Sequence, residues 1–158
     1  MRGLLVSLLC CMAAALVACD RVFVAEPLLS DLVGVYHLAP KSEAFLRERK
    51  GYGSIPSCVV ELQPDSIIFV RNLPDCTDDV FGRGRGKFLS ADGSWKIEKA
   101  FFGFGLTLHI APGGSMKPGI YVGSWAIRGR SAPHDLEIMV GDPDSGESIR
   151  YTRVQSSS

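Results

Sequence analysis

Short runs of alternating apolar and polar residues follow one another along most of the chain. In residues 135–141, for example, Leu136, Ile138 and Val140 alternate with other residues. An alternation of period two is typical of a β-strand with one buried face. The same pattern, enriched in Val, Ile, Phe, Tyr and Trp, predicts strands within residues 31–38, 57–63, 66–71, 86–90, 94–99, 104–110, 119–128, 135–141 and 147–154.

Residues that favour turns lie between these predicted strands. Pro, Asp and Gly cluster at 64–65, 91–93, 112–114 and 142–146. Such clusters predict tight connections between neighbouring antiparallel strands.

Residues 42–51 form the one segment with a helical pattern. Ser42 can cap the first turn, and Phe45 and Leu46 give an apolar face. Gly51 can end the helix in the left-handed conformation. About eight antiparallel strands with one short helix after the first strand predict an all-β domain. We expect a meander that closes as a small β-barrel, because closure removes unpaired strand edges, with a β-sandwich as the alternative.

The start of the chain has the layout of a secretory signal. Arg2 provides a positive charge, residues 4–18 carry none, and small residues gather toward the end of this run. A membrane-spanning helix needs about 20 apolar residues, so the run is too short to serve as a permanent anchor. We therefore expect residues 1–18 to be a signal peptide.

The segment 16–19, Leu-Val-Ala-Cys, resembles the lipobox of bacterial lipoprotein precursors. The resemblance implies cleavage between Ala18 and Cys19 and attachment of a diacylglyceryl group to the Cys19 thiol. Cys10 and Cys11 do not fit, because neither follows the required small residue. The resemblance thus implies a protein tethered to a membrane by lipid, since two or three acyl chains anchor stably where one does not.

Two alternatives concern the processing and the location of this tether. Cleavage after residues 13–15 would instead release a soluble protein. In enterobacterial lipoproteins an Asp directly after the lipidated Cys retains the protein at the inner membrane, and the resemblance implies the same for Asp20, with the outer membrane as the alternative. We expect a lipoprotein that faces the periplasm, with a linker over 19–30, a barrel-like domain over 31–155 and a disordered tail over 156–158.

Charge argues against nucleic acid as a partner. The chain has 17 Lys and Arg residues and 17 Asp and Glu residues, with no pole of either sign. Binding to phosphate backbones needs a concentrated basic surface.

Two cysteines remain in the expected mature domain once the signal and the lipidated residue are set aside. Cys58 and Cys76 form an even pair in an oxidising compartment, so we expect a disulfide between them. Zinc is a weak alternative, because neither lies in a Cys-x-x-Cys motif and no His lies close to either in the sequence.

The domain also resembles the small lipocalin-like (calycin) barrels of bacterial lipoproteins. The matching features are Gly34 and Tyr36 in the pattern Gly-x-Tyr, the helix that follows, and the closing hairpin over 141–154. The chain departs from lipocalins proper because no helix follows its last predicted strand. The resemblance implies a barrel, and it suggests a carrier of a small apolar ligand as one possible function.

Five aromatic residues are the best candidates for lining such a ligand cavity, because small barrels present inward side chains at their mouths. They are Tyr36, Trp95, Phe104, Tyr121 and Trp125. The alternative is that they simply fill the core, as side chains do in barrels of about eight strands.

Two further motifs invite chemical interpretations. The turn with Asp142, Asp144 and Glu147 suggests calcium, but it departs from the EF-hand pattern, and a hairpin turn explains it without an ion. Residues 81–87, Phe-Gly-Arg-Gly-Arg-Gly-Lys, open no helix and lack the ending of a phosphate loop. We interpret 81–87 as a mobile connection, with attraction to anionic lipid headgroups or cell-wall polymer as the alternative.

Catalytic residues are not evident. Ser115 lies in an incomplete nucleophile-elbow pattern between strands, His109 falls within a predicted strand, and His134 is followed by Asp135. The sequence therefore predicts a lipid-anchored, non-enzymatic domain without cofactor or metal, which binds an envelope protein or another envelope component. The alternatives are a carrier of a small apolar ligand and, third, a periplasmic hydrolase using Ser115 and His109.

Overall fold

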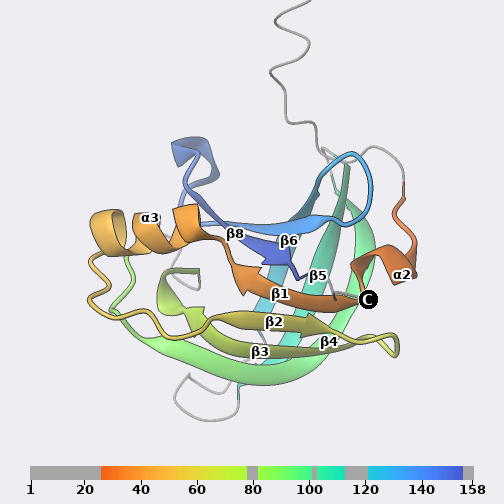
Figure 1. Cartoon of the computed structure of the whole chain (residues 1–158), viewed down its shortest axis with the longest axis horizontal. Coiled ribbons are helices and arrows are strands. Elements are labelled where there is room, and N and C mark those ends of the chain that lie inside the picture. The colour runs from red at the N-terminus through yellow and green to blue at the C-terminus, as the bar shows by residue number, and fades with distance from the viewer. Residues whose placement is uncertain (1–25, 78–81, 101–102, 113–120, 155–158) are drawn as a thin grey trace, which may run out of the picture.

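The computed structural model describes residues 26–77, 82–100, 103–112 and 121–154, and these form a closed β-barrel (Figure 1). Eight antiparallel strands follow one another around the barrel in chain order, and the last pairs with the first. The predicted meander and its closure are confirmed, and a sandwich is not formed. The strands are β1 Gly34–Leu38, β2 Val59–Leu62, β3 Ile67–Pro74, β4 Phe88–Ala100, β5 Gly103–Pro112, β6 Tyr121–Arg128, β7 Asp135–Met139 and β8 Ser148–Arg153.

Helix α3, Pro40–Lys50, follows β1 as predicted and ends at Gly51, whose φ of 72° is left-handed. It begins two residues earlier than expected because Pro40 occupies its first turn, where a missing N–H costs nothing. Ser42 is therefore not its N-cap. Its buried hydroxyl instead accepts a hydrogen bond of 2.8 Å from the Arg150 backbone N–H and fixes α3 to β8.

The predicted turn at 91–93 is wrong, because one long strand, β4, runs through it. Gly93 pairs with Ile68 on one side and with Ile110 on the other. A Cβ atom at Gly93 would lie 2.1 Å from the His109 carbonyl oxygen. This glycine permits a close approach of β4 to β5 and does not mark a turn.

Helix α2, Leu29–Leu32, precedes β1 and spans the predicted boundary at Asp31. Pro27 is buried, and Leu32 at the end of α2 is fully buried. Helix α2 therefore packs onto the barrel. No described helix is long and apolar enough to cross a membrane. The signal-peptide and lipidation residues, Ala18, Cys19 and Asp20 among them, and the tail 156–158 lie outside the described residues.

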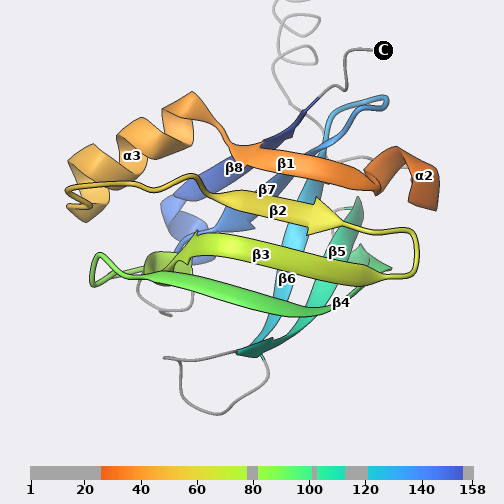
Figure 2. The same cartoon turned by 60° about the horizontal axis from the view of Figure 1, so that its bottom comes forward.

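Figures 1 and 2 show α2 and α3 at opposite ends of the barrel. The α2 end also holds the start of β1, the turn between β2 and β3, and the end of β8. The α3 end holds the β3–β4 connection and the turn between β7 and β8, which includes the short 3-10 helix Pro143–Ser145. These two ends have different surfaces.

Candidate functional site at the α3 end of the barrel

The barrel interior is filled by the aromatic residues that were candidates for a ligand cavity. Tyr36, Trp95 and Trp125 belong to the hydrophobic core and are at most 2 % exposed, and Phe104 packs against that core while partly exposed. Tyr121 begins β6, but its side chain lies outside the described part of the chain. The structure thus brings at least three of the five together as core, as the core-filling alternative predicted.

Hydrogen bonds to backbone carbonyls hold two of these side chains in place. The Trp95 indole N–H donates to the carbonyl oxygens of Gln63 and Ile67, at 3.2 and 3.1 Å. The Tyr36 hydroxyl donates to the Leu32 carbonyl at 2.5 Å, and burial raises its pKa to about 12. These polar atoms serve the fold and are not available to a ligand.

Arg153, at the end of β8, fastens α2 over its end of the barrel. Its guanidinium donates to the Asp31 carbonyl at 2.7 Å and to the Val33 carbonyl. Gly34 is needed beneath it, because a Cβ there would lie 2.7 Å from the Arg153 Nε atom. The role of Arg153 is not evident from the sequence, since its partners lie more than 100 residues away in the chain.

At the α3 end, residues 82–87 cross from the β3–β4 side of the barrel to β7. We call this segment the basic strap. A Cβ at Gly82 would lie 2.9 Å from a Val140 methyl group, and one at Gly84 would lie 2.3 Å from the Tyr52 hydroxyl. Gly82 and Gly84 therefore face the barrel and pack against it. The strap was predicted to be a mobile connection, but the structure shows it closely packed.

Asp75 anchors the strap through both carboxylate oxygens. It accepts hydrogen bonds from the backbone N–H groups of Arg85 at 2.9 Å and Lys87 at 3.1 Å, and its own N–H donates to the Lys87 carbonyl at 3.0 Å. It also accepts a 2.5 Å hydrogen bond from the buried hydroxyl of Tyr52. Burial and this bond raise the pKa of Tyr52 well above its ordinary value.

Because Gly82 and Gly84 face inward, the basic side chains that alternate with them face outward. Arg83, Arg85 and Lys87 are all exposed. Lys50 of α3 lies at the same end, where it contacts Glu147 in the β7–β8 turn at 2.7 Å. The α3 end thus presents an exposed, rigidly supported, cationic segment beside a helix with fixed ion pairs.

The expected disulfide is not present, because Cys58 and Cys76 are separate free thiols in the structure. Val59 pairs with Arg71, so position 58 lies opposite Asn72. Strand β3 continues past that point to Pro74, which places Cys76 four residues further along, in the 3-10 helix Asp75–Thr77.

Each cysteine has its own partner. The Cys58 thiol donates to the Pro56 carbonyl at 3.3 Å, and the Cys76 backbone N–H donates to the Tyr52 hydroxyl at 3.1 Å. Burial raises the pKa of both thiols, that of Cys58 to about 11. The loop does not fold back as pairing would have required.

The acidic turn after β7 is explained by the hairpin itself. The Asp142 carboxylate accepts the Asp144 N–H at 2.9 Å, and Glu147 points to α3, where the hydrogen bond from Lys50 lowers its pKa. Within the described residues, no group of His, Cys, Asp and Glu is placed to hold a metal ion.

The two histidines considered for catalysis lie at separate places in the barrel. His109 is exposed on the outer face of β5, and His134 is buried beside Asp135 at the start of β7. Ser115 lies outside the described residues. Nothing in the described residues joins them into a catalytic group.

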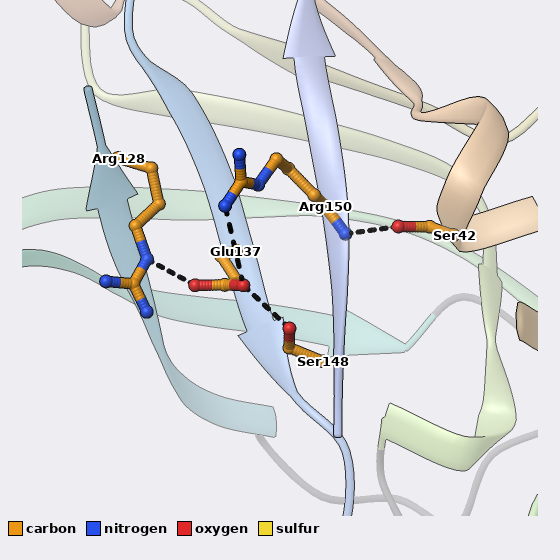
Figure 3. A network of polar contacts seen from close by, with 5 residues as sticks. All are labelled: Ser42, Arg128, Glu137, Ser148 and Arg150. Carbon is orange, nitrogen blue, oxygen red and sulfur yellow. Dashed lines mark hydrogen bonds and ion pairs between the residues drawn. The ribbon is translucent and has the colours of Figure 1, made fainter. Parts of the chain in front are cut away.

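A buried carboxylate on the barrel wall, Glu137, was not predicted from the sequence (Figure 3). Glu137 lies on the outer face of β7, yet its side chain is only 10 % exposed. It accepts hydrogen bonds from Arg128 of β6 and, at 2.6 Å, from the Ser148 hydroxyl, and it lies 3.9 Å from Arg150 of β8. Its polar partners occupy both carboxylate oxygens, so the cluster fastens three strands together.

Comparisons of the chain with protein-family models, with curated proteins and with solved structures give no match in any of the three.

Proposed function

We propose that this protein is a lipid-anchored, non-enzymatic domain of the bacterial cell envelope that faces the periplasm and binds a partner through the α3 end of its barrel. The observation that carries the proposal is the filled interior. Large aromatic side chains are packed across the barrel, and α2 and the basic strap close its two ends. A barrel whose interior is occupied by its own side chains offers its outer surface for binding.

The chemistry of the α3 end indicates the kind of partner. Arg83, Arg85 and Lys87 are exposed, and hydrogen bonds to Asp75 fix the backbone of the strap. A rigid row of cations loses little conformational freedom on binding, which favours an acidic protein surface or an anionic envelope component.

Lipidation is tested by labelling bacteria that express the protein with a palmitate analogue. The wild type should be labelled, and Cys19→Ser should abolish the label. Cys10→Ser is the matched control and should keep it. Label retained on Cys19→Ser would exclude the tether.

Binding at the α3 end is tested with a photo-crosslinking residue in intact cells. At position 85 on the strap it should give a crosslinked product, and the additional change Arg83→Glu should weaken that product. The control is position 96, because Lys96 is also an exposed cation but lies on β4, on the barrel wall. Equal products at both positions, or none at either, would contradict the proposal.

One observation favours a carrier as the second candidate. The indole N–H of Trp125 is fully buried and has no hydrogen-bond acceptor among the described residues. A small, largely apolar ligand with one acceptor atom would satisfy it, provided that the core rearranges to admit the ligand. Native mass spectrometry of the protein released from membranes distinguishes the two functions, because only a carrier retains a bound small molecule.

A further inference from the structure

The exposed apolar side chains of the barrel gather at the α2 end. Among the residues that the structure describes, five large apolar side chains are exposed: Leu28, Leu29, Val35, Ile67 and Val154. We call them the apolar rim. Exposed apolar residues scattered singly are ordinary, but a group at one end of a small domain indicates a surface that something covers.

Their positions in the chain place all five at this end. Leu28 and Leu29 lie at the start of α2, and Ile67 is the first residue of β3. Val35 is the second residue of β1, and the N–H of Val154, just after β8, donates to its carbonyl at 2.8 Å. At the α3 end, by contrast, no described large apolar side chain is exposed, and the exposed residues include charged ones such as Arg49 and Arg85.

Contacts between α2 and the barrel fix the position of Leu28 and Leu29, the first residues of the apolar rim. Leu32 is buried in the barrel, and Arg153 and Tyr36 bind the carbonyl groups of α2. The Asp31 carboxylate accepts the Leu28 N–H at 3.2 Å, so this acidic group is turned back toward the helix. Leu28, which is 67 % exposed, is therefore presented to the surroundings by the fold.

The length of chain before the rim indicates what covers it. Cys19 lies nine residues before Leu28. An extended chain spans at most about 3.4 Å per residue, so Leu28 stays within about 30 Å of the lipidated residue. A bilayer that holds Cys19 is thus always within reach of this end of the barrel.

We propose that the apolar rim lies against the bilayer that carries the lipid anchor, with Leu28 and Leu29 in the interfacial region and the basic strap pointing away into the periplasm. The inference rests on the proposed lipidation of Cys19. The acyl chains already hold the protein at the membrane, so the rim determines the orientation of the barrel and contributes little to retention. Interfacial binding of this kind needs only a modest apolar area beside the tether.

Tryptophan fluorescence of the lipidated protein in phosphatidylcholine vesicles tests this orientation. Leu28→Trp places a reporter in the rim, and Glu48→Trp places one on the exposed face of α3 as the matched control. Trp95 and Trp125 are buried in the core and give a constant background. In vesicles with brominated acyl chains, the Leu28→Trp emission should lie at shorter wavelength than the Glu48→Trp emission, and bromine should quench it. The Glu48→Trp emission should show neither effect.

Three other outcomes would overturn the inference, and they differ in what else they overturn. Equal quenching of both reporters in palmitate-labelled protein excludes the orientation but leaves the tether. A second copy covers the rim if the Leu28→Trp emission lies at short wavelength, is not quenched by bromine, and loses this short-wavelength position when the protein is diluted in the membrane. Protein that lacks the palmitate label and stays out of the vesicles overturns the tether as well. Circular dichroism matching that of the wild type shows that each variant is folded.

Discussion

Replacing Glu137 by Ala should destabilise the barrel far more than removal of an ordinary surface acid. The substitution removes a carboxylate that links β6, β7 and β8 and takes away the counter-charge that Arg128 and Arg150 share. The Ser148 hydroxyl loses its acceptor at the same time.

The magnitude follows from the burial of each partner. Hydrogen bonds to charged groups contribute about 1.5–3 kcal/mol, and exposed ion pairs about 0.2–1 kcal/mol. The Arg128 side chain is 22 % exposed and the Arg150 side chain 37 %, so the Arg128 bond lies toward the lower end of the first range and the Arg150 pair, at 3.9 Å, adds little. With about 1.5 kcal/mol for each of the hydrogen bonds from Arg128 and Ser148, the free energy of unfolding should fall by about 3 kcal/mol.

The assay is urea unfolding of the chain from Asp20 onward, followed by the fluorescence of the buried Trp95 and Trp125. The matched control is Glu43→Ala. Glu43 also pairs with an arginine, Arg47, but that pair is exposed and spans one turn of α3, so its loss should cost less than about 1 kcal/mol. A loss for Glu137→Ala no larger than for Glu43→Ala would refute the role of the cluster.

Two further predictions concern the α3 end. Gly84→Ala should lower the free energy of unfolding by about 1–3 kcal/mol in the same assay, because its Cβ would lie 2.3 Å from the Tyr52 hydroxyl. Gly53→Ala, with open space around its Cβ, should change the free energy of unfolding by less than about 0.5 kcal/mol. Equal effects of the two substitutions would contradict the packed strap. The pKa of Cys58 rises from its ordinary 9.0 to about 11 in the folded state, so between these pH values the folded protein keeps a proton that the unfolded chain loses. The contribution of Cys58 to the free energy of unfolding should therefore be fully present below pH 9 and be lost between pH 9 and 11. Cys58→Ala should flatten this part of the stability profile, and an unchanged slope would show that the thiol is not the group responsible.

Local patterns in the sequence determined the class of fold. The alternation of apolar and polar residues predicted the strands, and the turn residues predicted the hairpin at 64–65 that joins β2 to β3 and the turn at 142–146 between β7 and β8. Gly51 predicted the end of α3 correctly. These features depend on neighbours in the chain, where side-chain direction and backbone preference act directly.

Features that depend on contacts between distant strands were not predictable in the same way. Gly93 looked like a turn residue, but it allows two strands to approach closely. Glu137 alternates with apolar residues in the sequence, but its burial depends on arginines from both neighbouring strands that cover it. Cys58 and Cys76 looked like a pair, but strand register separates them.

The basic strap shows the same division most clearly. The sequence by itself determined that 81–87 is rich in glycine and positive charge, which is typical of a mobile connection. Only the tertiary structure decided that Gly82 and Gly84 pack against Val140 and Tyr52 and so turn the basic side chains outward. The physical reason is that a glycine's role depends on what stands where its Cβ would be, and closure of the barrel, not the local sequence, brings those atoms together.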